Sequence, residues 1–292
     1  MNEIDSIVGT KETNKKSFDR DAWIKQKQEQ RKFAYDTMDK TAEEIIQDIS
    51  KFKTYLDIQG RFDKYSVGNA LLITNQMPNA TRLKEFDDWK EQGAFIKKNE
   101  NGIIILEPGD QYTRSDGSFA TSYNPKKMFD ITQTTAKQSV LASLYDDRTK
   151  LTALLKECPV DIKAVDTIPN SNNVAEWNKD DNVLYVQRTD DIQRTFKEIS
   201  TELARVSLEE SGNAELDNFK CKCTAYMLCK KYDIDTSNFD INYIPEEFKK
   251  MSASEIRNEL SSMRTAMSDI NARMNQHFES ISKNQKNKDY ER

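Results

Sequence analysis

The chain has 292 residues, of which 36% are hydrophobic and 32% charged, with a net charge of -5 at neutral pH. A prior of about 150 residues per domain predicts two domains, and the apolar content excludes a disordered chain. No run approaches the roughly 18 apolar residues of a membrane helix. The start of the chain carries charges rather than a secretory core, so we expect a cytoplasmic protein.

The only histidine, His277, excludes a Ser-His-Asp triad and a multi-histidine zinc site built from this chain alone. Charge is divided unevenly. Residues 1–140 hold 22 of the 44 Lys and Arg residues and 22 of the 49 Asp and Glu residues. Residues 141–292 therefore hold 22 basic and 27 acidic residues. Nucleic acid would therefore need a local patch on the neutral first half.

The first half predicts a small α+β domain. Residues 18–56 have the apolar spacing of amphipathic helices, and a further helix begins near Lys64 and is closed by Pro78. A Gly/Ser/Thr-rich, hairpin-like stretch joins two predicted strands. The strands are residues 103–106 and 128–131. Residues 1–16 show no apolar periodicity and are expected to be flexible.

Beyond a polar linker predicted at Thr132–Gln138, the second half is mainly helical with short strands. The last helix begins at Ser252, which forms a capping box with Glu255. Its apolar stripe either docks on the parent domain or holds a dimer partner. The other expected elements are helices 141–155, 196–207 and 216–232 and strands 160–165 and 182–186.

These elements predict the α+β class with a flexible terminus (1–16), a first domain (17–136) and a second domain (137–292) with a C-terminal amphipathic helix. Four cysteines form no C-x-x-C pair, so a disulfide framework is not expected. Three of them, Cys221, Cys223 and Cys229, are either soft metal ligands or buried thiols, and we favour thiols.

One series of residues in the first half is distinctive. It comprises Tyr65-Ser66-Val67-Gly68-Asn69-Ala70-Leu71-Leu72-Ile73, then Gln76, Pro78, Trp89, Gly93, Ile96-Lys97-Lys98 and Met128-Phe129-Asp130-Ile131-Thr132-Gln133-Thr134. Over residues 20–135 it resembles the N-terminal domain of ArdC-type antirestriction proteins and their LtrC-like relatives in conjugative elements. The resemblance implies single-stranded DNA binding, followed by a zinc-metallopeptidase-like domain.

The second half resembles that peptidase-like domain but departs from its H-E-x-x-H zinc motif. Thr201 and Arg205 stand in place of the histidines, and only Glu202 is kept. Lysines, among them Lys222, replace the acidic residues of the later helix. The resemblance therefore implies a degenerate peptidase site without zinc. Glu202 is either a leftover base or, as we favour, an i,i+3 partner of Arg205 on a solvated helix face.

The first half offers candidate nucleic-acid contacts. Trp89, Tyr65 and Phe95 either stack on bases or fill the core. Asn69 and Gln76 share a helix face with Ser66, and these amides either contact the strand or make internal hydrogen bonds. The cations follow a phosphate track or form a solvated surface. The full candidate set is Tyr65, Ser66, Asn69, Gln76, Arg82, Trp89, Lys97 and Lys98.

The sequence thus predicts a non-enzymatic single-stranded DNA-binding protein of a plasmid, phage or conjugative element. It could shield incoming DNA from host restriction or nucleases. The alternative is a pseudoenzyme that sequesters a protein through the inert cleft or the C-terminal helix. No cofactor is expected, and the oligomeric state stays open.

Overall fold

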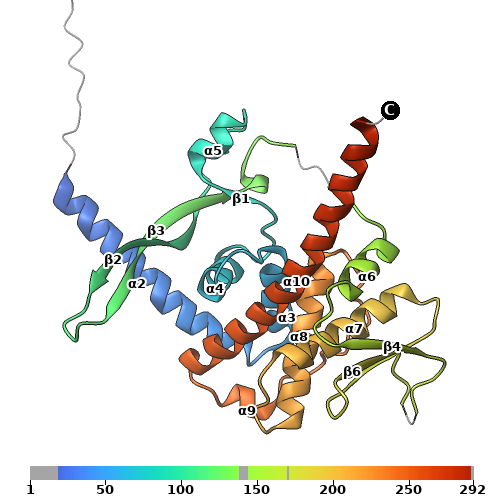
Figure 1. The fold of residues 1–292 in the computed structure, drawn as a ribbon. Helices are drawn as coiled ribbons and strands as arrows, with labels where there is room; N and C mark the ends of the chain where they lie inside the picture. The colour runs from blue at the N-terminus through green and yellow to red at the C-terminus, as the bar shows by residue number, and fades with distance from the viewer. Residues whose placement is uncertain (1–18, 138–143, 170, 291–292) are drawn as a thin grey trace, which may run out of the picture.

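The computed structural model describes residues 19–137, 144–169 and 171–290, with side chains as far as residue 283. The predicted flexible terminus, residues 1–16, lies outside the described residues. Helices and small sheets occupy separate stretches of the chain, which confirms the α+β class (Figure 1). Within the described ranges, no helix is long and apolar enough to cross a membrane.

Three helices open the structure: α2 (Arg20–Ile45), α3 (Ile49–Arg61) and α4 (Val67–Gln76). Each begins where a side chain accepts hydrogen bonds from free backbone N–H groups of the first turn, a preferred way to start a helix. These N-cap residues are Asp19, Asp48 and Ser66. The cap at Asp48 divides the predicted helical region 18–56 into two helices.

A long hairpin lies across α2 in Figure 1. Its strands are β2 (Ile103–Thr113) and β3 (Phe119–Asp130), with a bulge between Pro108 and Gln111. The short β1 (Leu83–Lys84) pairs with β3, giving the sheet order β1-β3-β2, and α5 (Phe86–Glu91) follows β1. The hairpin is longer than the two predicted strands because its polar outer part continues the pairing.

The predicted linker is wrong for residues 132–134. A short 3-10 helix, η1 (Ile131–Gln133), follows β3 and is held by a capping box between Asp130 and Gln133. The Gln133 amide also donates to the backbone oxygen of Asn101 at 2.8 Å. Gln133 and Thr134 are buried. The polar composition predicts a linker here, whereas hydrogen bonds within the fold satisfy these side chains.

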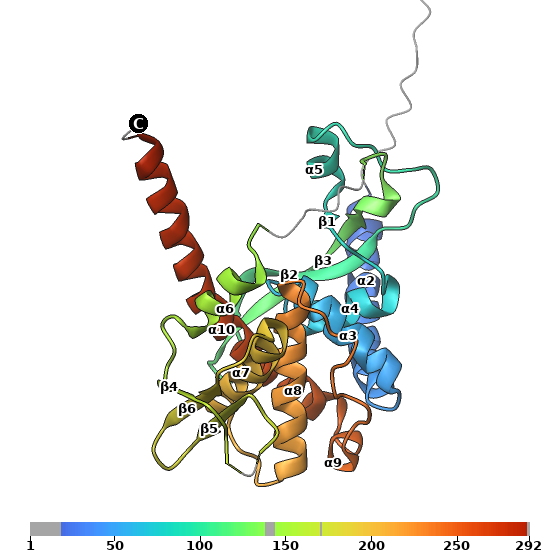
Figure 2. The same cartoon turned by 90° about the vertical axis from the view of Figure 1, so that its right-hand side faces the viewer.

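In the second half, a mixed three-stranded sheet accompanies several helices (Figure 2). Strand β6 (Val183–Gln187) lies between a parallel β4 (Asp161–Val165) and an antiparallel β5 (Ala175–Asn178). The sequence did not predict β5, which is only four residues long. The helices are α6 (Asp147–Leu155), α7 (Ile192–Ser207), α8 (Ala214–Lys231), α9 (Glu246–Lys249) and α10 (Ala253–Tyr290).

Helix α10 docks on its own chain, one of the two alternatives for its apolar stripe. The capping box is present, with the Ser252 backbone N–H donating to Glu255 at 2.8 Å. The stripe is buried in the main core. In both views the last turns of α10 project beyond the body (Figures 1 and 2). The buried stripe residues are Ile256, Leu260, Met263, Met267, Ile270, Met274 and Phe278.

The main apolar core is continuous between the two halves, since it contains residues of α3 and α4 together with residues of α7, α8 and α10. Polar contacts also join the halves. Tyr226 donates to Asp57 at 2.9 Å, and Lys231 pairs with Asp63 at 2.8 Å. The predicted division near residue 136 therefore separates two stretches of sequence that share a core.

Candidate functional site

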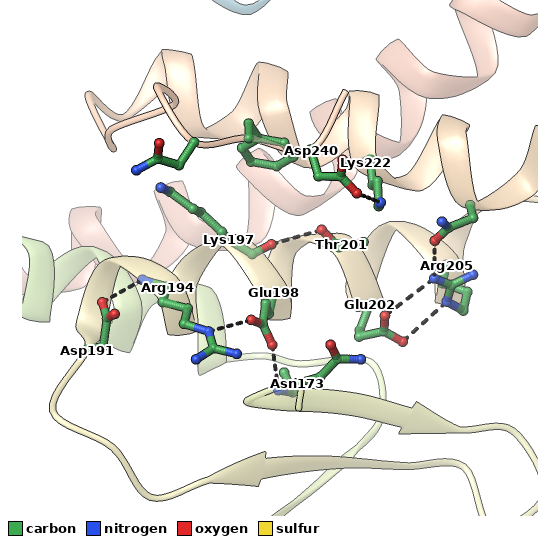
Figure 3. Close-up of a pocket in the computed structure, with 14 residues that line it drawn as sticks. Asn173, Asp191, Arg194, Lys197, Glu198, Thr201, Glu202, Arg205, Lys222 and Asp240 are labelled. Atoms are coloured by element: carbon green, nitrogen blue, oxygen red, sulfur yellow. Dashed lines mark hydrogen bonds and ion pairs between the residues drawn. The ribbon is translucent and has the colours of Figure 1, made fainter. Parts of the chain in front are cut away.

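A charged cleft of about 520 Å³ lies beside α7 in the second half (Figure 3). Helix α7 forms one wall, because its polar residues recur every three or four positions on the face opposite its core-facing residues. The α7 residues that line the cleft are Arg194, Lys197, Glu198, Thr201, Glu202 and Arg205. The remaining walls include Asn173, Ala175, Asn218, Lys222, Asn238, Phe239 and Asp240.

The four residues of the predicted degenerate site, Thr201, Glu202, Arg205 and Lys222, all line this cleft. The predicted Glu202–Arg205 pair is present, with Arg205 Nε 3.3 Å from the carboxylate. Arg205 also donates to Asn218 at 3.1 Å. The expectation of a solvated helix face is wrong for Glu202, which is only 9% exposed. Strand β5 and helix α8 pack against this part of α7 and cover it.

Two carboxylates of α7 bond to the free edge of β5. Glu202 accepts a hydrogen bond from the Trp177 backbone N–H at 3.2 Å, and Glu198 accepts one from the Ala175 N–H at 3.3 Å. An unpaired strand edge is a template for pairing with an extended peptide. Side chains of the same molecule occupy these donors, so strand addition at this edge would first have to displace them.

The donor set does not fit zinc. Zinc takes neutral imidazole, thiolate or carboxylate ligands, whereas Arg205 brings a permanent positive charge and the Thr201 hydroxyl donates to the Lys197 backbone oxygen at 2.9 Å. Lys222 is paired with Asp240. Among the residues that the structure describes, no group of three or more His, Cys, Asp or Glu side chains could hold a metal ion.

The α8 cysteines are buried thiols, as favoured from the sequence. Cys221, Cys223 and Cys229 are each at most 2% exposed. Burial raises the pKa of the Cys221 thiol to about 11, and it raises that of Cys223 well above the ordinary value. A thiol with a raised pKa forms little thiolate near neutral pH, which makes it a poor nucleophile and metal ligand.

Three of the candidate nucleic-acid contacts make internal hydrogen bonds. The Asn69 amide both donates to and accepts from the Leu106 backbone, at 2.9 and 2.8 Å. Gln76 makes the same pair of bonds to Ile104, both at 2.9 Å. Trp89 is 1% exposed and donates to the Phe129 backbone oxygen at 2.8 Å. These side chains fix α4 and α5 to the hairpin.

The other candidates are closer to solvent. Ser66 caps α4, and the half-buried Tyr65 packs its ring 5.8 Å from that of Phe62. Lys97 is exposed and donates to the Thr132 backbone oxygen at 2.7 Å. Lys98 is exposed and Arg82 is partly exposed. Phe95, the third aromatic considered for stacking, is 59% exposed.

A second cleft, of about 470 Å³, lies between α2, β3 and α5. None of its residues is among the site residues predicted from the sequence, although Trp23 stands out as a tryptophan in a mostly charged segment. We call it the α2–α5 cleft. It is lined by Trp23, Gln26, Lys27, Gln30, Glu85, Phe86, Asp87, Pro125, Lys126, Lys127 and Phe129.

Comparison with known proteins gives few matches. No family model matches the chain. An uncharacterized protein of Bacillus anthracis is 23% identical over 266 aligned positions, which cover 70% of this chain. The chain spans only 45% of the length of that relative.

Two crystal structures of the antirestriction ArdC protein from plasmid R388 are similar at 12% identity. The metal-free one has a TM-score of 0.49 and covers 73% of this chain and 86% of that chain. The manganese-bound one has a TM-score of 0.48, with 72% and 85% covered. An ArdC antirestriction protein is therefore among the solved structures to which the chain is similar.

Proposed function

We propose that the protein binds single-stranded DNA through its first half and belongs to a mobile genetic element, where it protects incoming DNA from restriction or nucleases. The element and its role are implied by the resemblance of residues 20–135 to ArdC-type proteins. The binding itself is supported by an observation on the surface of the molecule, the distribution of its exposed aromatic side chains.

Eight of the nine exposed large aromatic residues among those described lie in the first half. Single-stranded nucleic acid is held by aromatic rings that stack on unpaired bases, aided by cations that follow the phosphates. The second half has one such ring and 27 acidic residues against 22 basic ones. The eight are Trp23, Phe33, Tyr35, Phe86, Phe95, Tyr112, Phe119 and Tyr123.

Fluorescence anisotropy of a labelled oligothymidine with the full chain tests the proposal. We expect saturable binding that weakens as salt rises, because phosphate contacts release counterions. A duplex of the same length should bind more weakly, since its bases are already stacked. Equal affinity for the duplex, or no binding at low salt, would contradict the proposal.

We further propose that the α7 cleft is not a peptidase site, because its cationic donor set does not suit zinc. Elemental analysis of the purified protein should find far less than one zinc per chain, and a chelator should leave the thermal midpoint unchanged. A structural zinc would stabilise the fold and its removal would lower that midpoint. One zinc per chain would contradict this part of the proposal.

The alternative function, sequestration of a protein by the inert cleft, is favoured by Lys197. This half-buried side chain lines the cleft and makes no hydrogen bond or ion pair with another described residue. Two results together would select this alternative. The protein would not bind DNA, and a second protein would copurify with the wild type after nuclease treatment but not with Lys197→Glu.

A further inference from the structure

We propose that the α2–α5 cleft is where the single strand binds, with Trp23 and Phe86 as stacking surfaces and Lys127 as a phosphate contact. This inference rests on the proposed function and gives it a site. None of these three residues belongs to the candidate set drawn from the sequence.

The two aromatic rings come from elements far apart in the chain. Trp23 lies in the first turn of α2 and is 47% exposed, and Phe86 opens α5 and is 52% exposed. Both line the same cleft, with the partly buried Phe129. Isolated exposed apolar residues are common on protein surfaces. Two large aromatic rings that line one open cleft are a pattern that suits stacking on successive unpaired bases.

The cations of the cleft differ in how much they are already engaged. Lys126 is paired with Glu85 and Glu107, and Lys27 donates to the Pro125 backbone oxygen at 2.9 Å. The side chain of Lys127 is exposed and makes no hydrogen bond or ion pair with another described residue, although its backbone pairs with β2. Its ammonium group is therefore available to a phosphate without breaking an existing contact.

The charge of the lining suits a ligand held mainly by stacking. The lining contains three lysines and two carboxylates, Glu85 and Asp87, so its net charge is +1. Lys126 already forms an ion pair with Glu85. So small an excess supports one phosphate contact rather than a long electrostatic track. Most of the affinity at this cleft should therefore come from the rings, with a shallow dependence on salt.

An extended peptide fits the cleft less well. On the side facing α2, two backbone oxygens of β3 already accept hydrogen bonds. Lys27 donates to the oxygen of Pro125, and Arg31 donates to that of Tyr123 at 2.8 Å. A peptide that added to this sheet would need those oxygens. Duplex DNA is also disfavoured, because its paired bases cannot reach both rings. Unpaired bases remain the ligand that the geometry favours.

The test uses the full chain and a labelled fifteen-residue oligothymidine. Trp23→Ala and Phe86→Ala should each weaken binding by about 5- to 150-fold, the range for loss of one stacked base. Lys127→Ala should reduce the slope of log affinity against log salt by about 0.7, the value for one contact to a single strand. Circular dichroism would verify that each variant is folded.

Matched controls come from outside the cleft. Tyr243 is an exposed aromatic residue of the second half, and Lys32 is an exposed cation of α2 that does not line the cleft. Tyr243→Ala and Lys32→Ala should each stay within twofold of the wild type. A second readout is tryptophan emission, whose quenching by the strand should be much weaker in Trp23→Phe. Of the other two tryptophans, Trp89 is buried and Trp177 lies in β5, outside the cleft.

The outcomes separate the two proposals. If the wild type does not bind the oligonucleotide, the proposed function fails. If it binds but the cleft variants match the controls within twofold and the quenching is unchanged in Trp23→Phe, the cleft is not the site although the function stands. If a labelled extended peptide binds and Trp23→Ala weakens that binding, while the oligonucleotide does not bind, the ligand is a protein and both proposals fail.

Discussion

Asp130 shows how one side chain can organise a junction between elements. It is fully buried at the end of β3, and its carboxylate accepts hydrogen bonds from the backbone N–H groups of Thr81, Arg82 and Thr132 at 2.6, 2.8 and 3.0 Å. Burial acts to raise the pKa of Asp130, but these hydrogen bonds outweigh it and hold that pKa below its ordinary value.

Replacing Asp130 by Asn should lower the free energy of unfolding by about 2 to 3 kcal/mol at neutral pH, since an amide cannot accept all of these bonds. The folded-state pKa is depressed, so this stabilisation is full above the unfolded pKa of about 3.9 and is lost as the pH falls through the folded pKa. Denaturant unfolding of both proteins at several pH values should show the difference shrinking in acid. A difference independent of pH would contradict this account.

Asn69 and Gln76 illustrate residues whose role the sequence left open. Each amide forms a reciprocal pair of hydrogen bonds with one backbone unit of β2, and Asn69 is only 7% exposed. Two such pairs, separated by two turns of α4, fix this helix against the strand. Of the two alternatives, the structure thus supports internal hydrogen bonding rather than contact with a ligand.

Asn69→Ala should therefore lower the free energy of unfolding by about 3 kcal/mol, because a buried N–H and a buried oxygen of Leu106 both lose their partner. Oligonucleotide affinity of the folded variant should stay within twofold of the wild type. Urea denaturation and anisotropy measure the two effects. If the variant were as stable as the wild type but bound the oligonucleotide more weakly, Asn69 would be a nucleic-acid contact.

At the scale of elements, α3 and α8 approach closely at Gly60. A Cβ atom added there would lie 2.7 Å from the backbone oxygen of Met227, closer than real contacts allow. Gly68, in α4, would instead bring a Cβ 2.6 Å from the sulfur of Met38, the flexible end of a side chain. Gly60 thus faces a rigid backbone atom, whereas Gly68 faces a flexible side chain.

Gly60→Ala should destabilise the protein by on the order of 2 kcal/mol, since backbone must move and overpacking exceeds the gain of up to about 1 kcal/mol in helix propensity. Gly68→Ala is the matched comparison and should change stability by less than about 1 kcal/mol, because Met38 can change rotamer. Thermal midpoints of the two variants give the ranking. The reverse ranking would mean that α3 and α8 pack more loosely than described.

At the scale of the whole molecule, the two halves share one main core and are also joined by α10. Arg264 of α10 donates to the backbone oxygens of Tyr65 and Asp63 at 2.7 and 3.1 Å, near the start of α4. A helix from the end of the chain thus stabilises an element of the first half. The halves should therefore depend on each other for stability.

We expect the full chain to unfold in one cooperative transition, with the calorimetric enthalpy equal to the van't Hoff enthalpy. Met267→Ala, in the buried stripe of α10, should lower the single midpoint rather than split the transition, since a large-to-small change in a core costs about 2 to 5 kcal/mol. Two resolved transitions, only one of them shifted by Met267→Ala, would show that the halves fold independently.

The sequence by itself determined the elements whose apolar spacing or capping residues are local. The apolar stripe and the capping box predict α10, and Pro78 predicts the end of α4. Each signal involves residues only a few positions apart, so the local sequence is enough to predict these helices. The resemblance of this segment to an H-E-x-x-H motif likewise predicts that Thr201, Glu202 and Arg205 lie close together, since one helix carries all three.

Only the tertiary structure decided what polar and aromatic side chains do, because their partners lie far away in the chain. Gln133 lies in the predicted linker yet is buried against Asn101, and Trp89 and Asn69 turn inward to backbone groups that no local pattern reveals. Trp23 and Phe86 line one cleft across more than 60 residues of sequence. A local pattern records hydrophobicity and spacing, whereas a binding surface depends on which distant elements pack side by side.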